Sequence, residues 1–239
     1  VILKNNYQDF LARNDINSHS ELFDVLRYMF GKEFKFSRPF IAKPGTVDAN
    51  NLDVARRILA DYDVISIDEI VDIFNQNHII YLSLRSILIQ LNDEFLQVSK
   101  DFMGRAKEEV MTEKVKRTIL GRLQSLIAEK GYIAGRAIEN FKGFPDIGYP
   151  WNPYLLRSVT EKYFTDKIGM VDVLTSSLGS MNTIFVKKEF SDMSYSEFLE
   201  FVIKRRHEKQ PFKSSKEVRE WVKSERLDLK VKQALDVLD

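Results

Sequence analysis

The chain lacks cysteine and has little histidine, and both features limit the sites it can form. None of the 239 residues is Cys, which excludes disulfide bonds and thiolate zinc sites and is compatible with a reducing compartment. The three histidines, His19, His78 and His207, are far apart in the sequence. We therefore expect no metal centre.

Long apolar runs are also missing. No stretch approaches the roughly 18 apolar residues that a membrane-spanning helix needs, so we expect no membrane contact. The opening run Val1-Ile2-Leu3 is too short for a signal peptide, and we expect a cytoplasmic location. Because the first residue is Val1 and not Met, we expect a trimmed chain or a fragment of a longer protein.

An excess of charge of either sign is missing as well. The chain holds 36 Lys and Arg against 35 Asp and Glu, whereas dedicated DNA-binding domains are usually basic. Any contact with nucleic acid would have to use local basic faces. The sequence has no Gly-rich phosphate loop with its lysine, no His-Glu-x-x-His and no Gly-x-Ser-x-Gly, so we expect neither an enzyme nor a cofactor.

The chain does contain a recurring helix pair, in which a helix, a short turn and a polar cap precede an amphipathic helix. Two of the second helices start with a capping-box pattern, Ser66 with Glu69 and Ser214 with Glu217. The four predicted pairs cover residues 7–12 with 20–30, 52–61 with 66–75, 113–130 with 133–141, and 195–207 with 214–224.

Two of these pairs are followed by a third helix and by strands. A helix over 78–91 precedes a strand over 95–99, and the alternating segment 34–41 could pair with that strand. A helix from Asn152, as N-cap, to Phe164 precedes a hairpin of 168–174 and 183–188 with its turn at 178–181.

The order helix, helix, helix, strand resembles the winged-helix superfamily over residues 34–189. The resemblance implies a mainly α fold with small β wings, in which tandem winged helix-turn-helix units are flanked by helix pairs. The expected domains are an N-terminal helical segment (1–33), a first winged-helix unit (34–104), a second with a linker helix (105–190), and a C-terminal helix pair (191–239).

The two third helices share a nearly identical tetrapeptide. Leu84-Arg85-Ser86-Ile87 matches Leu156-Arg157-Ser158-Val159 except for Ile in place of Val. Third helices of helix-turn-helix proteins enter the major groove of DNA, where Arg can donate two hydrogen bonds to guanine. The candidates for reading bases are Tyr81, Ser83, Arg85, Ser86, Gln90, Asn152, Tyr154, Arg157, Ser158 and Lys162. The alternative is that these polar residues only cover the solvent side of short helices.

Basic residues around the wings and flanks are candidates for phosphate contacts, which hold DNA without reading its sequence. They are Lys100, Arg105, Lys107, Lys187, Lys188, Arg205 and Arg206. The alternative is a solvated helix face that nearby glutamates such as Glu200 and Glu208 neutralise.

The loop from Gly143 to Trp151 combines glycines and prolines with Phe144, Ile147 and Tyr149. Such a loop could anchor a partner, but we favour the interpretation that its large side chains fill the core of the second unit.

These features predict a protein that binds double-stranded DNA in transcriptional regulation or in the handling of mobile or foreign DNA. The alternative is a protein-interaction scaffold, a module of a larger assembly with a protein partner and no nucleic-acid contact.

Overall fold

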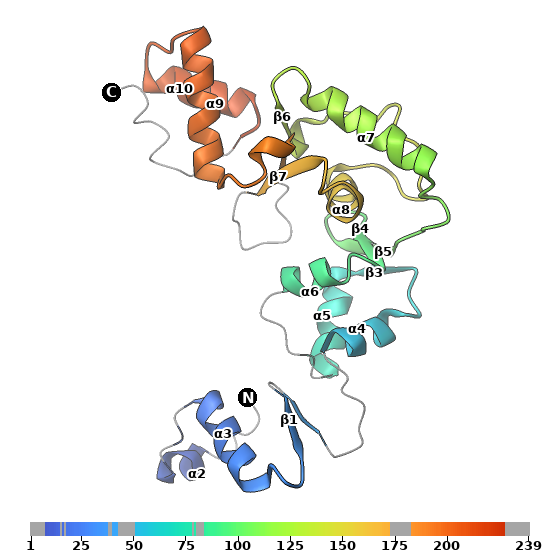
Figure 1. The fold of residues 1–239 in the computed structure, drawn as a ribbon, viewed down its shortest axis with the longest axis vertical. Coiled ribbons are helices and arrows are strands. Elements are labelled where there is room, and N and C mark those ends of the chain that lie inside the picture. Colours follow the sequence, from blue (N-terminus) through green and yellow to red (C-terminus); the bar gives the residue numbers. More distant parts are fainter. Residues whose placement is uncertain are drawn as a thin grey trace. The chain divides into compact units, whose positions relative to one another are not determined.

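The computed structural model describes residues 8–14, 16, 18–37, 40–42, 51–77, 79, 84–172 and 183–227 (Figure 1). The chain forms two compact units, Val1–Val54 and Ala55–Asp239, and each is considered by itself.

The N-terminal unit contains the helices α2 (Gln8–Arg13) and α3 (His19–Phe30) and the strands β1 (Lys35–Ser37) and β2 (Phe40–Ala42). A complete capping box starts α3, because Ser18 Oγ accepts from the Glu21 N–H and Glu21 Oε2 accepts from the Ser18 N–H, both at 3.1 Å. β1 pairs antiparallel with β2. The predicted pairing of segment 34–41 with the strand near residue 95 is therefore wrong.

The second unit begins with a three-stranded antiparallel sheet and its helices. Their order is α4 (Asn51–Leu59, which starts before the unit boundary), β3 (Val64–Ser66), α5 (Ile67–Gln76), α6 (Leu84–Gln90), β4 (Phe95–Gln97) and β5 (Phe102–Arg105). The order within the sheet is β3-β5-β4. Ser66 Oγ accepts from the Glu69 N–H at 3.1 Å, so Ser66 caps α5 as predicted.

A similar order of elements then recurs, with a 3-10 turn in the place of α5. It comprises α7 (Glu113–Ile127), β6 (Tyr132–Ala134), the 3-10 turn η1 (Gly135–Ala137), α8 (Pro153–Tyr163), β7 (Ile168–Asp172) and β8 (Thr183–Lys187), with sheet order β6-β8-β7. Gly131 has φ +84°, a left-handed conformation that favours glycine, and it turns the chain from α7 into β6.

The C-terminal part adds the turn η2 (Lys188–Phe190) and the helices α9 (Tyr195–Lys209) and α10 (Ser215–Ser224). Ser194 and Ser214 cap these helices. Phe198 and Val202 of α9 share an apolar core with Val218 of α10 and with Tyr132 of β6. A second core joins α7 and α8 to β4, β7 and β8.

The fold class predicted from the sequence is wrong. Within the described ranges the chain has nine α-helices and, besides the β1-β2 pair, two three-stranded antiparallel sheets, so the fold is mixed α/β and not mainly α. Tandem winged helix-turn-helix units are not what the structure shows, because the predicted helix over 133–141 does not form. Tyr132–Ala134 is a strand paired with β8, and one 3-10 turn follows it. The apolar spacing of that segment fits a helix equally well, and only its pairing with the distant β8 decides.

Candidate nucleic-acid interface

Asn152 starts α8, as predicted, and also ties this helix to the first sheet. Its Oδ1 accepts from the N–H groups of Tyr154 (2.9 Å) and Leu155 (3.1 Å). Its Nδ2 donates to the Val98 carbonyl, just after β4, at 2.6 Å. Both ends of the side chain are therefore engaged within the chain.

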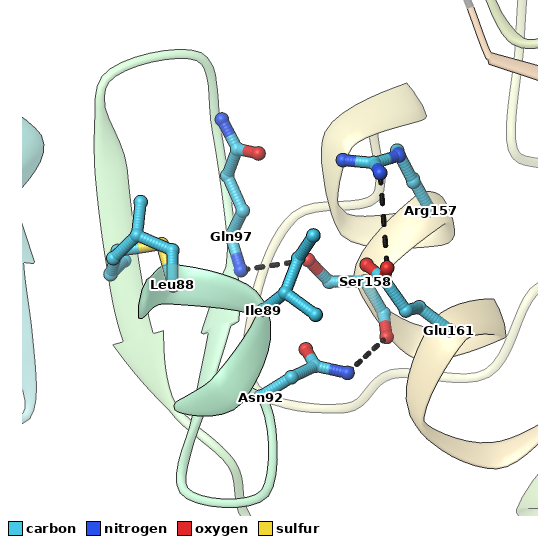
Figure 2. Close-up of a pocket in the computed structure, with 8 residues that line it drawn as sticks. Leu88, Ile89, Asn92, Gln97, Arg157, Ser158 and Glu161 are labelled. Atoms are coloured by element: carbon cyan, nitrogen blue, oxygen red, sulfur yellow. Dashed lines mark hydrogen bonds and ion pairs between the residues drawn. The ribbon is translucent and has the colours of Figure 1, made fainter. Parts of the chain in front are cut away.

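Ser158 faces the first sheet and not solvent. Its side chain is buried, and Ser158 Oγ accepts from the Gln97 N–H of β4 at 2.9 Å (Figure 2). Asn92 Nδ2 donates to the Ser158 carbonyl at 3.4 Å. The hollow beside these groups measures about 20 Å³, which is too small for a small-molecule ligand.

Arg157 joins α8 to the second sheet. Its Nη2 lies 3.1 Å from Asp172 Oδ2 of β7 and 3.8 Å from Glu161 Oε1, and its side chain is only 14% exposed. Asp172 Oδ1 also accepts from Thr183 Oγ1 at 2.5 Å. The guanidinium is therefore held within the chain by two carboxylates, although a base-reading role for it stays a prediction.

Lys162 is nearly buried at the C-terminal end of α8. Its side chain is 9% exposed, and its Nζ lies 3.0 Å from Glu108 Oε1 and donates to the Asp93 carbonyl. Glu108 Oε1 also accepts from the Tyr163 hydroxyl at 2.7 Å. Burial alone would raise the pKa of Glu108, but the hydrogen bonds from Tyr163 and Lys162 outweigh it and hold this pKa below its usual range.

For the remaining base-reading candidates the structure gives few or no side-chain contacts. Tyr154 is half-buried, and burial raises its pKa. Gln90 is exposed at the end of α6. Tyr81 and Ser83 lie outside the described residues, and of Arg85 and Ser86 only the helical backbone of α6 is described. Each of the two matching tetrapeptides lies in the helix that precedes the second strand, in chain order, of its repeat: α6 before β4 and α8 before β7.

Two of the phosphate-contact candidates have side-chain contacts within the chain. Arg105 donates to the carbonyls of Ala60 and Tyr62 and lies 3.7 Å from Asp63 Oδ1. Lys107 Nζ lies 4.8 Å from the centre of the Tyr149 ring. Lys100 is exposed in the β4-β5 turn.

Other phosphate-contact candidates come from segments that meet at the turn between α7 and β6. The Lys187 N–H donates to the Gly131 carbonyl at 3.1 Å, and Arg205 Nη1 would lie 3.8 Å from a Cβ placed on Gly131. Lys187, Lys188 and Arg205 are all exposed. We call these three residues, with Lys130 beside them, the Gly131 patch. Arg206 is half-buried, donates to Gln210 Oε1 at 2.7 Å and covers the Phe212 ring.

Charge is unevenly distributed along the second unit. Residues 55–112 contain six Lys and Arg against ten Asp and Glu, whereas residues 113–227 contain 21 against 15. The neutral total therefore conceals an acidic first repeat and a basic remainder, which includes the Gly131 patch. Sequence reasoning missed this division and the contribution of Lys130, although both can be counted from the sequence.

The loop after η1 fills the core, which confirms the favoured interpretation. Ile147 is buried, the Phe144 and Trp151 rings lie 5.0 Å apart, and Trp151 Nε1 donates to the Pro145 carbonyl at 2.6 Å.

Comparisons with protein families, with curated proteins and with solved structures give no match. In the described part of the chain no three His, Cys, Asp or Glu side chains are grouped so that they could hold a metal ion. No helix within those residues is long and apolar enough to cross a membrane.

Proposed function

We propose that this chain binds double-stranded DNA through its phosphate backbone, with the Gly131 patch as the contact. The proposal includes a binding role without catalysis, a cytoplasmic location, and action in transcriptional regulation or in the handling of mobile or foreign DNA. The observation that carries it is that three separate segments, which carry Lys130, Lys187 with Lys188, and Arg205, come together at one turn. Clustered cations of this kind neutralise phosphates and release counterions.

The internal contacts of α8 argue for phosphate contacts and against base reading as the main source of affinity. Arg157, Ser158 and Lys162 would each have to give up a partner inside the chain before meeting a base. The exposed cations of the Gly131 patch on β8, η2 and α9 incur no such cost.

The test is the salt dependence of binding to random duplex DNA. The logarithm of the binding constant should fall steeply with the logarithm of salt concentration, and the Lys187→Ala/Lys188→Ala double variant should make this slope shallower by about 2. Lys114→Ala, at an exposed lysine near the N-terminal end of α7 and outside the Gly131 patch, is the matched control and should leave the slope unchanged. Absence of binding at low salt would contradict the proposal, as would an unchanged slope in the double variant.

A protein-interaction scaffold is the second candidate, and one observation favours it. In the N-terminal unit α3 exposes Val25 (39%), Tyr28 (92%) and Met29 (62%). These positions fall on one side of the helix, and exposed aromatic and Met side chains are typical anchors for partner proteins. Failure to bind duplex DNA at low salt would favour this candidate.

A further inference from the structure

A groove with a volume of about 390 Å³ lies among the C-terminal end of α7, β6, α9 and α10. It is large enough for a small ligand, since such sites in proteins typically measure about 300–1,000 Å³. The residues that matter in its lining are Lys130, Tyr132, Arg205, Lys209, Trp221 and Glu225.

One wall of the groove presents two cations. Arg205 and Lys209 are four residues apart on α9, so their side chains share one face of the helix. Both are exposed, and neither has a hydrogen-bond or ion-pair partner among the described residues. These two side chains can therefore donate to an anion without breaking any described contact.

Another part of the lining is fixed by a hydrogen-bonded network. Lys130 Nζ lies 2.7 and 2.8 Å from the two oxygens of Glu225, and the Tyr132 hydroxyl donates to Glu225 Oε2 at 3.2 Å. Burial, helped by the Glu225 charge, raises the pKa of Tyr132 well above its usual value, so the hydroxyl keeps its proton. The half-buried Trp221 adds an aromatic surface to the lining.

The charge of the lining suits a phosphate group. The groove is lined by four cations, Lys130, Arg205, Arg206 and Lys209, and by two carboxylates, Glu129 and Glu225. The balance is two positive charges, close to the charge of about −1.5 to −2 of a phosphate monoester near neutral pH. An aromatic wall next to such a charge is typical of sites that stack a base.

We propose that this groove binds a nucleoside 5′-monophosphate, with the phosphate on Arg205 and Lys209 and the base against Trp221. The ligand could be a free nucleotide or the 5′-phosphorylated end of a nucleic-acid strand, because both carry the same chemistry. This inference goes beyond the contact of duplex DNA with the Gly131 patch and can hold or fail independently of it, although the two sites share Lys130 and Arg205.

The test is a titration of the full chain with AMP, followed by tryptophan fluorescence. The expected result is saturable quenching that is lost in Trp221→Phe, while Trp151, packed between Phe141 and Phe144, continues to report a folded chain. Lys209→Ala should weaken binding about tenfold or more, because it removes a charged hydrogen-bond donor to the phosphate. Lys213→Ala, an exposed lysine outside the groove, is the matched control.

Further titrations distinguish a free nucleotide from the 5′-phosphorylated end of a strand. A short single strand with a 5′ phosphate that competes with AMP, while the same strand without it does not, would assign the site to strand ends. Binding of AMP alone would assign it to a free nucleotide. Equal affinity for adenosine and AMP, or no saturable quenching by AMP, would overturn the proposal. AMP binding that is unchanged in Lys187→Ala/Lys188→Ala would show that the groove is distinct from the DNA contact.

Discussion

Removal of the Arg157 side chain should destabilise the fold before it affects any ligand. The guanidinium bridges α8 to Asp172 of β7 at 3.1 Å, and the two side chains are only 14% and 26% exposed. Arg157→Ala leaves the Asp172 carboxylate partly buried without its cation.

The magnitude follows from the burial of the pair. Loss of one partner from a fully buried ion pair costs roughly 3–5 kcal/mol, whereas exposed pairs contribute about 0–1 kcal/mol. Because this pair keeps some contact with water, we expect Arg157→Ala to lower the free energy of unfolding by about 2 kcal/mol. Urea denaturation followed by circular dichroism measures this change, and Arg117→Ala on the exposed face of α7 should change it by less than about 0.5 kcal/mol.

A double-mutant cycle with Asp172→Asn isolates the pair. The amide introduced by Asp172→Asn keeps an oxygen that can accept from Thr183, so the cycle reports mainly the charge interaction, and we expect a coupling of about 1–2 kcal/mol. A coupling below about 0.3 kcal/mol would refute the reasoning. Under conditions where the variant stays folded, a loss of sequence-specific DNA affinity of about 1–3 kcal/mol would instead support the base-reading role predicted from the sequence.

Three further predictions concern the junction between the two repeats. A Cβ on Gly104 would lie 2.7 Å from the Tyr149 ring, so Gly104→Ala should lower the free energy of unfolding by about 1–3 kcal/mol, and an unchanged urea midpoint would contradict this close approach. Asn152→Ala removes the cap of α8 and should cost about 1 kcal/mol or more in the same assay, whereas Asn152→Ser, which keeps a capping oxygen and places no acceptor against the Val98 carbonyl, should cost less. The folded-state pKa of Glu108 is lowered, so the stabilising contribution of Glu108 is complete above its ordinary pKa and is lost as the pH falls below about 4.5. Glu108→Gln should therefore show a smaller drop in melting temperature between about pH 5 and pH 3 than the parent chain. Equal drops would contradict the contact of Glu108 with Lys162.

Helix starts were the most predictable part of the fold. Ser66, Asn152 and Ser214 each cap a helix as their sequence context indicates. A cap depends on contacts within one turn of the chain, so the residues that determine it are adjacent in sequence. The length of α7 and the strands β7 and β8 were also close to the prediction.

The short strands could not be predicted, and they decide the fold class. β3 and β6 have three residues each, too few to show an alternating pattern. Each becomes a strand only by pairing with a later segment, β3 with β5 and β6 with β8. Tyr132 and Ile133 are compatible with a strand or with a helix, and the left-handed Gly131 together with β8 selects the strand.

The sequence predicts basic residues of the candidate site, but it does not predict which parts of the chain surround the candidate residues. Local basic composition indicates Arg205 and Lys187, and the structure brings their segments to one turn. For the echoed tetrapeptide the same reasoning indicated a solvent face. Apolar spacing fixes which side of a helix packs inward, but it carries no information about what the polar side meets. In α8 that side meets β4 through Ser158 and β7 through Arg157, so a polar pattern that is typical of an exposed reading helix here joins two sheets. The match between the two tetrapeptides therefore indicates that they have the same position in a repeated order of elements. Whether they also have the same function depends on the residues that pack against them, and those residues come from elsewhere in the chain.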